Sequence, residues 1–388
     1  MFDPNHPVFA PLLLPADEAA VDECAPLAAA ILSATVATND RLRPLWRKVR
    51  DRAERLIVDP RTANLQFEGY MSMEDVRSLP YSPGQTTLGT LWQPAEFDRE
   101  RRSEVIASVS ALQKHLEADV LVAPYFLIPD PTHPWLEVAV DIAREARDAA
   151  AGRPLAVHAC VDIDTILAAP ARDAYGSAFR DTQADLFLLT VVNLDEREAP
   201  PDEVRAVLDL LAQLSGTAPT LLLHVGRLGL SAIASGAAGY SSGALTLEAY
   251  PRRYFREGLV SLPSDTHYLP GAMVTLPVRL ATAVAECVAA TDTAGAPPAS
   301  RMVRRLRTRR ALDAKAGEVQ WLGAIPDGER HDALAARLEA AIELCTEAQG
   351  LLAERDGEQF TRSGFHYLEV LREISGGEQA ELLGGAGF

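Results

Sequence analysis

The sequence predicts an α/β fold, a (β/α)8 barrel of the TIM type with extra helices at its N- and C-terminal ends. Its candidate strands are short runs that are apolar almost throughout rather than alternating, which is typical of parallel strands covered on both faces. Segments with helical periodicity separate these runs, as in consecutive βαβ units. There are eight candidates, the number that closes such a barrel. An open doubly wound sheet is the alternative.

The predicted elements divide the chain into three parts. The candidate strands are Leu56–Val58, Thr87–Trp92, Asp119–Ile128, Pro154–Val161, Ala184–Leu194, Thr220–Val225, Ala238–Ser242 and Leu269–Leu276. The main predicted helices are Asp98–Glu117, Trp135–Ala151, Thr165–Thr182, Pro201–Ser215, Leu228–Ser235, His331–Arg355 and Phe365–Ile374. We expect a helical N-terminal extension over residues 1–54, built from Ala16–Ala37 and Asp40–Glu54, and the barrel over residues 55–290. A linker, an arginine-rich segment and C-terminal helices follow over residues 291–388.

The composition is that of a globular protein with a strongly acidic balance. With 388 residues, of which 48% are hydrophobic, the chain can bury a large core. Its formal net charge of -17 repels nucleic acid and anionic membranes at long range. The local exception is Arg301–Arg310, with six arginines in ten residues, which could contact nucleic acid. We expect it instead to be solvated or to pair with acidic surfaces of this chain or of a partner.

Cysteine usage and the N-terminal sequence indicate a reduced, cytoplasmic protein. The cysteines Cys24, Cys160, Cys287 and Cys345 lie far apart and form no CxxC pair. The start, MFDPNHPVF, lacks the basic and apolar regions of a signal peptide. No apolar stretch is long enough to cross a membrane. The sequence leaves the cofactor unknown, and none is predicted from it.

Polar residues at or just after the apolar runs are the candidate site residues, because ligands of such barrels bind at the carboxyl ends of the strands. Asp59, Asp162 and His224 are the candidate acid/base groups, since neighbouring carboxylates and imidazoles shift one another's pKa toward neutrality. The alternative is that each aspartate caps a helix or forms a turn. His158 and His224 could hold a metal with an aspartate, but the chain has no HxH or HExxH pattern, so we predict none.

A second group of residues forms a candidate anion site. Gly226 and Arg227 precede the helix Leu228–Ser235, whose first N–H groups could bind a phosphate or carboxylate. Tight packing of the helix on the strand is the alternative explanation for the glycine. The full set of candidate ligand-binding residues is Arg61, His158, Asn193, Gly226, Arg227, Ser241 and Ser242.

The stretch LLLHVGRLGLSAIASGAAGYSSG resembles a strand–helix–strand step late in the barrel of tRNA-guanine transglycosylases. In that family an apolar strand ending in Val-Gly precedes a helix and a glycine-containing strand. The resemblance implies a barrel fold. The family's cysteine-rich zinc motif is absent, because Tyr268–Leu276 contains no cysteine. The family also uses aspartates as nucleophile and base, where this chain has Tyr240-Ser241-Ser242. No catalytic residue is transferred from it.

These observations leave three functional hypotheses. The first is an enzyme-like barrel, of the transferase or hydrolase type if it is catalytic. It would bind a polar, anionic or nucleotide-like small molecule, with Asp59 and Asp162 as acid/base groups, His224 positioning the ligand and Arg227 holding its anion. The second is a non-catalytic barrel that serves as a scaffold, with a protein partner or a second copy. The third is a degenerate relative of tRNA-guanine transglycosylases.

Overall fold

A parallel β-sheet forms the centre of the molecule in the computed structural model, which describes residues 2–71, 73–82, 91–245, 248–250, 266–288, 304–355 and 365–376. Its strands are β1 (Val8–Phe9), β4 (Leu121–Val122), β5 (Leu127–Ile128), β6 (Leu155–Asp162), β7 (Leu186–Val192), β8 (Thr220–Leu223) and β9 (Gly239–Ser241). They are ordered β1-β9-β8-β7-β6-β4, with β5 also pairing with β6. All these pairs are parallel. The order from β4 to β9 follows the chain, whereas a doubly wound sheet reverses its order at a switch point.

Two further parallel strands, β2 (Ala30–Ser33) and β3 (Leu56–Asp59), pair with each other. Single parallel bridges join this pair to both ends of the larger sheet. Leu12, just after β1, bridges to Ile31 in β2, and Ile57 in β3 bridges to Val120 just before β4. Main-chain hydrogen bonds accompany both bridges, including one from the Asp119 amide to the Leu56 carbonyl oxygen at 2.9 Å.

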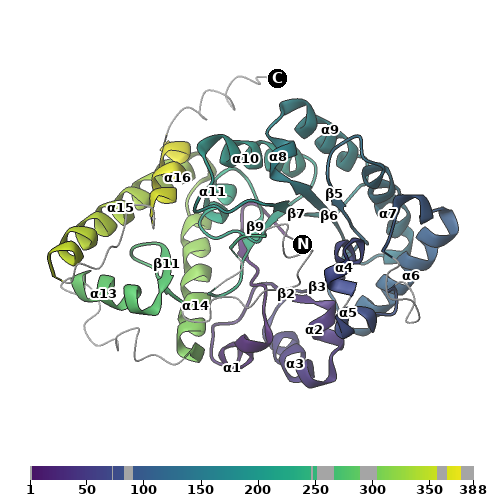
Figure 1. The fold of residues 1–388 in the computed structure, drawn as a ribbon, viewed down its shortest axis with the longest axis horizontal. Helices are drawn as coiled ribbons and strands as arrows, with labels where there is room; N and C mark the ends of the chain where they lie inside the picture. Colours follow the sequence, from purple (N-terminus) through teal and green to yellow (C-terminus); the bar gives the residue numbers. More distant parts are fainter. Residues whose placement is uncertain are drawn as a thin grey trace.

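Helices cover the outside of the sheet (Figure 1). They are α1 (Glu18–Val21), α2 (Ala34–Thr38), α3 (Arg43–Arg52), α4 (Glu68–Met71), α5 (Glu74–Arg77), α6 (Arg99–His115), α7 (Pro134–Ala150), α8 (Ile163–Ile166), α9 (Ala169–Arg180), α10 (Pro201–Ser215) and α11 (Leu228–Ala234). After the sheet come α13 (Val278–Val288), α14 (Arg304–Gly323), α15 (Arg330–Arg355) and α16 (His366–Gly376), on one side of the sheet. Among the described residues, no helix is both long and apolar enough to cross a membrane.

Most of the predicted strands and helices between β3 and α11 are confirmed, and α10 has the predicted bounds. Apolar runs flanked by clear helix starts make these elements easy to locate: Asp98 caps α6 through its side chain, and proline occupies the first turn of α7 and α10. The strand predicted over Asp119–Ile128 is two short strands, because Pro124 lies between them and has no N–H for the ladder.

The prediction of a purely helical stretch over residues 1–54 is wrong. It contains β1 and β2, which pair with β9 and β3. Alanine is a strong helix former, which favoured a helix over Ala16–Ala37. Ala30 is instead fully buried in a strand, where packing decides the conformation. The helix predicted within Asp40–Glu54 is confirmed as α3.

Two other strand predictions also need correction. Leu269–Leu276 does not add a strand to the parallel sheet. It spans the turn of an antiparallel hairpin, β10 (Thr266–Leu269) and β11 (Val274–Pro277). In Thr87–Trp92, residues 87–90 lie outside the described residues, and Leu91 and Trp92 are not in a strand. The predicted linker over residues 291–300 also lies outside the described residues.

Part of the arginine-rich segment, residues 304–310, begins α14 and contacts the acidic N-terminal region. Arg305 forms an ion pair of 3.2 Å with Glu23, and Arg304 lies 3.9 Å from Asp17. Arg307 is buried. These arginines therefore contact acidic groups of the same chain, and residues 301–303 lie outside the described residues.

Candidate functional site

A small cavity lies at the carboxyl ends of the parallel strands, and we name it the rim cavity. Its volume is about 60 Å³. It is lined by residues that follow β1, β2, β3 and β8, by α4 and α5, and by one tyrosine after β9: Leu12, Leu13, Leu14, Ser33, Thr35, Val36, Arg61, Asn64, Tyr70, Met73, Val76, His224 and Tyr250. Parallel strands bring these residues together because their carboxyl ends meet at one edge of the sheet. Arg61 and His224 are predicted site residues.

Asp59 and Arg61 form one unit at the end of β3. Oδ1 of Asp59 accepts hydrogen bonds from the Arg61 amide at 2.9 Å and from the Tyr125 hydroxyl at 2.8 Å. Oδ2 of Asp59 lies 3.9 Å from Nε of Arg61, at the outer limit of an ion pair. All three side chains are buried. Asp59 is therefore fixed by its neighbours and holds the turn that presents Arg61.

The guanidinium of Arg61 is only partly used by the protein. Nη2 donates to the Tyr250 hydroxyl at 3.2 Å. The side-chain oxygen of Asn64, in the amide orientation that satisfies both groups, accepts from Nε at 3.1 Å and from Nη2 at 3.3 Å. Within the described part of the chain, Nη1 makes no hydrogen bond. Because a buried guanidinium normally uses its donors, this nitrogen is available to a ligand.

His224 lies beside Tyr250, with ring centroids 4.3 Å apart. Its Nδ1 is buried and has no hydrogen-bond partner among the described residues. Burial, followed by the charge of Arg61 and the proximity of His158, holds the pKa of His224 well below its usual value. The imidazole is therefore neutral at neutral pH, with one ring nitrogen unused.

His158, in the middle of β6, lies deeper than the rim. Nε2 pairs with the Thr190 hydroxyl at 2.8 Å, and Nδ1 is buried without a hydrogen-bond partner among the described residues. Its ring lies 3.8 Å from the ring of Tyr125. Burial lowers the pKa of His158 to about 4, against the opposing charge of Asp59. A second neutral imidazole thus lies next to the Asp59–Tyr125 pair.

Three of the predicted site residues have left-handed backbone conformations. The φ angles are 56° at Arg61, 67° at Asn193 and 60° at His224. Asn193 and His224 directly follow β7 and β8, and Arg61 is the second residue after β3. This conformation costs a residue with a side chain about 1–2 kcal/mol, and glycine avoids that cost. Left-handed backbone also occurs at Glu117, Ala151, Gln183 and Met273, so at Arg61 and His224 it supports a functional role only together with their position in the rim cavity.

Asp162 and Asn193 form a separate pair at the ends of β6 and β7. The Asn193 amide nitrogen Nδ2 donates to Oδ2 of Asp162 at 2.9 Å, and the Asp164 main-chain amide donates to Oδ1 at 3.2 Å. Asp162 is thereby the N-cap of α8, as the helix-cap alternative expects. Neither residue lines the rim cavity. The main-chain amide of Asn193, however, donates to the Tyr250 carbonyl oxygen at 3.0 Å.

The anion site expected at Gly226 and Arg227 already holds an internal anion. The carboxylate of Glu196 accepts hydrogen bonds from the main-chain amides of Gly226, Arg227 and Leu228, at 2.8 to 3.0 Å. The side chain of Arg227 donates through Nη1 to Glu318, and to the Tyr268 hydroxyl at 2.6 Å. The main-chain amides that we expected to bind a ligand are therefore occupied by Glu196, and Nη1 of Arg227 is occupied by Glu318 and Tyr268. Nη2 of Arg227 is buried and has no hydrogen-bond partner among the described residues.

Arg227 belongs to what we name the buried ionic cluster: Glu196, Arg227, Glu248, Tyr268, Lys315 and Glu318. Lys315 of α14 is fully buried and donates to Glu248 at 2.7 Å, to the Ser242 hydroxyl at 2.9 Å and to the Gly243 carbonyl oxygen at 3.0 Å. Ser242, a predicted ligand-binding residue, is thus a partner of Lys315. Ser241 is buried within β9.

Proton affinities within the buried ionic cluster are strongly shifted. Burial, followed by the negative charge of Glu248, raises the pKa of Glu196 to about 7. Burial also disfavours the charge of Glu248, but the positive charges of Lys315 and Arg227 have the larger combined effect. The pKa of the Glu248 carboxyl is therefore lowered. Burial lowers the pKa of Lys315 against the attraction of Glu248. The cluster balances its charges internally, and none of its members lines the rim cavity.

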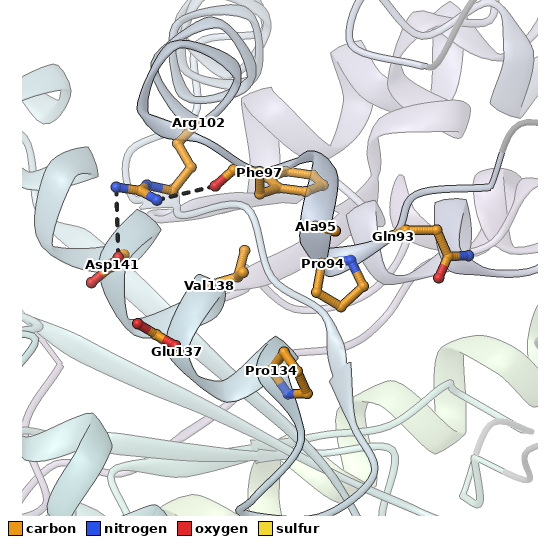
Figure 2. Close-up of a pocket in the computed structure, with 9 residues that line it drawn as sticks. All are labelled: Gln93, Pro94, Ala95, Phe97, Arg102, Pro134, Glu137, Val138 and Asp141. Atoms are coloured by element: carbon orange, nitrogen blue, oxygen red, sulfur yellow. Dashed lines mark hydrogen bonds and ion pairs between the residues drawn. The ribbon is translucent and has the colours of Figure 1, made fainter.

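A larger pocket opens on the outside of the molecule, between η4 (Pro94–Glu96) and α7, with a volume of about 480 Å³. Figure 2 shows Arg102 turned toward Asp141 and the Phe97 carbonyl oxygen rather than toward an open site. Arg102 also pairs with Glu145 at 2.8 Å. The pocket contains no predicted site residue. We therefore place the candidate site at the rim cavity, despite its smaller volume.

Sequence reasoning missed Tyr125 and Tyr250, which position Arg61 and His224, and most of the buried ionic cluster. Tyr125 could have been found, because a hydroxyl within the apolar run DVLVAPYFLI needs a polar partner. Tyr250 and Glu196 lie in loops without a local signal. Lys315 and Glu318 lie in an arginine-rich helix that reads as solvated. Among the described residues, no group of three or more His, Cys, Asp or Glu side chains is placed to hold a metal ion.

Comparisons with known proteins leave the family of this chain open. No protein-family model and no curated protein matches it. One similar solved structure is the carboxyl transferase domain of Rhizobium etli pyruvate carboxylase with oxamate and biotin, at 12% identity and a TM-score of 0.36 over 97% of this chain. The chain spans 63% of the length of that protein. A mutant of FabK from Thermotoga maritima aligns at 14% identity and a TM-score of 0.28, covering 89% of this chain and 96% of that one. We base no inference on alignments at these scores.

Proposed function

We propose that the parallel strands close into a (β/α)8 barrel and that the chain is an enzyme-like protein binding an anionic small molecule in its rim cavity. Closure is supported by the single bridges that join β2 to the segment after β1 and β3 to the segment before β4. With these bridges, every strand from β1 to β9 neighbours the next along the chain, when β4 and β5 are taken as one. That is the strand order of a (β/α)8 barrel.

One observation carries the functional proposal: Arg61 and His224 both line a cavity at the strand ends, and each has a nitrogen without a partner within the described residues. A guanidinium with a free nitrogen attracts a carboxylate or phosphate. A neutral imidazole can accept or donate a proton. We assign anion binding to Arg61 and proton transfer to His224, with Asp59, Tyr125 and Tyr250 as positioning residues.

The charge of Arg61 links ligand binding to the basicity of His224. That charge follows burial among the causes that lower the pKa of the imidazole. An anion paired with Arg61 would compensate the charge and so raise the pKa of His224 toward its usual value. The base would then become stronger only when the ligand is bound. Asp162, which caps α8, and the Gly226–Arg227 turn, which holds Glu196, have structural partners that account for them.

The scaffold hypothesis remains the alternative function, and exposed apolar surface would favour it. Among the described residues, the large hydrophobic side chains classed as exposed are Leu167 and Leu351. They lie on different parts of the chain and do not define a docking surface. The proposed kinship with tRNA-guanine transglycosylases stays an untested prediction from the sequence.

The test is a thermal-shift screen of the full chain with small anions, on the wild type and on Arg61→Gln. The matched control is Arg147→Gln. Arg147 pairs with Asp185, and the carboxylate of Asp185 accepts a hydrogen bond from the Leu155 amide at the start of β6. We expect at least one anion to raise the melting temperature of the wild type and of Arg147→Gln, but not of Arg61→Gln. Stabilisation of Arg61→Gln equal to that of the wild type would contradict the proposal, and an absence of any stabilising anion would favour the scaffold.

A further inference from the structure

The size of the rim cavity limits the ligands that it can hold. The ligand class inferred from this size rests on the proposed function. The cavity measures about 60 Å³. One water needs about 10–15 Å³ on this measure. The cavity therefore has room for about four to six water-sized atoms. Drug-sized ligands occupy sites of about 300–1,000 Å³, so a nucleotide-sized ligand does not fit within it.

The lining combines one cation with apolar and uncharged polar side chains. Arg61 supplies the positive charge, and His224 beside it is neutral because its pKa is lowered. Apolar side chains come from the segment after β1, from α2 and from the α4–α5 region: Leu12, Leu13, Leu14, Val36, Met73 and Val76. Uncharged polar side chains complete the lining: Ser33, Thr35, Asn64, Tyr70 and Tyr250. A ligand that matches this lining carries a single negative charge on a short apolar body.

We infer that the rim cavity binds a short-chain monocarboxylate of about four to six non-hydrogen atoms. Its carboxylate would pair with Nη1 of Arg61, and its hydrocarbon part would contact the apolar side chains. Inorganic phosphate has a similar size, but at neutral pH it is a mixture of the monoanion and the dianion, and it has no apolar part. One guanidinium that also faces Asp59 at 3.9 Å cannot balance a dianion, and the apolar lining would remove its hydration.

The test is isothermal titration calorimetry of the full chain with acetate, propionate, butyrate, hexanoate, inorganic phosphate and propionamide, at constant ionic strength. We expect propionate or butyrate to bind most tightly, with hexanoate and propionamide at least tenfold weaker. Propionamide keeps the shape of propionate without its charge, so the comparison isolates the pairing with Arg61. Equal binding of propionamide and propionate would overturn the inference.

Two variants of the cavity wall test its size without touching Arg61 or His224. Met73→Ala removes a partly buried wall residue and should shift the preferred chain toward hexanoate. Val76→Phe should fill the cavity and weaken propionate binding at least tenfold, while urea unfolding confirms that the variant is folded. An unchanged chain-length preference in Met73→Ala would show that the carboxylates bind elsewhere.

The outcomes separate this inference from the proposed function. If phosphate or hexanoate binds the wild type most tightly and Arg61→Gln abolishes that binding, the ligand class is wrong and the anion site stands. If none of the anions binds to the wild type or to Met73→Ala, both fail. If propionate binds equally well to the wild type and to Arg61→Gln, the carboxylate site is not at Arg61, and both fail.

Discussion

Arg61 and Arg227 are two buried arginines that follow strands of parallel pairs, yet their surroundings differ. Each guanidinium lies over a tyrosine ring, at 5.8 Å for Arg61 on Tyr250 and 4.4 Å for Arg227 on Tyr268. Arg227 donates directly to a carboxylate, whereas Nε of Arg61 stays 3.9 Å from Asp59. Arg61 lines a cavity and Arg227 does not.

The difference shows how one residue type serves two purposes in one fold. Glu318, which neutralises Arg227, comes from α14, and its position was not visible from the sequence around β8. The buried ionic cluster thus joins the C-terminal helices to the sheet. At the rim cavity the protein leaves part of a charge unmatched, which is costly unless a ligand uses it. Variants of each region should therefore separate a structural role from a binding role.

The largest effect is expected in the buried ionic cluster. Glu318→Ala should lower the free energy of unfolding by about 3–5 kcal/mol, because it leaves Arg227 buried without its carboxylate. Urea unfolding measures this change. Replacing both partners, in Arg227→Met with Glu318→Leu, should recover much of the loss. Glu339→Ala, which removes an exposed partner of Arg372, is the control and should cost less than about 1 kcal/mol. A loss equally small in Glu318→Ala would mean that the cluster is not structural.

The next effect is the acid sensitivity of the histidines near the rim. Burial lowers the pKa of His158 to about 4, so between about pH 6.5 and pH 4 the unfolded chain binds a proton that the folded chain does not. Stability contributed by neutral His158 should therefore be lost as the pH falls through this window, by up to about 3 kcal/mol. His158→Gln should flatten the fall in urea-unfolding stability over this pH range. Identical pH profiles of the wild type and His158→Gln would contradict the prediction.

The buried ionic cluster should respond to pH with the opposite sign. The pKa of Glu196 is raised to about 7 by burial and by Glu248, so the folded chain holds a proton that the unfolded chain loses above about pH 4.5. The stability linked to this proton is present below that pH and is lost as the pH rises through about 7. The change should be on the order of 1–3 kcal/mol. Glu196→Gln should remove it in unfolding measurements between pH 4.5 and pH 8. A steeper rather than flatter profile in that variant would refute the assignment.

The smallest effect concerns the backbone of His224. Because its φ angle is 60°, His224→Gly should be more stable than His224→Ala by about 1 kcal/mol. Both variants should lose the proton-transfer function equally. Thermal unfolding of the two variants measures the difference. If the alanine variant were the more stable one, the left-handed backbone at His224 would not be strained.

Much of the fold could be predicted from the sequence, because buried parallel strands are apolar throughout and helices between them have clear starts. The rule that polar residues gather at the carboxyl ends of parallel strands correctly grouped Arg61 and His224 at one cavity, with Asp59 beside Arg61. Alanine-rich Ala28–Leu32 was misassigned, because its local helix preference is overruled by burial beside β3.

The rest of the site depends on contacts between distant segments. No local pattern marks Tyr250, yet its hydroxyl accepts from Arg61, 189 residues earlier in the chain. Glu196 was hidden in a loop, and its carboxylate lies on the amides that we expected a ligand to occupy. The apolar runs therefore located the rim, but could not show which of its polar groups the protein itself satisfies.

The most direct test of the account is the ligand-induced change in melting temperature in two variants measured side by side. Arg61→Gln alters the rim cavity, and Glu196→Gln alters the buried ionic cluster without changing the size of the side chain. With saturating propionate, the account predicts that stabilisation is lost in Arg61→Gln and retained in Glu196→Gln. Stabilisation retained in Arg61→Gln and lost in Glu196→Gln would place the ligand in the cluster and contradict the account.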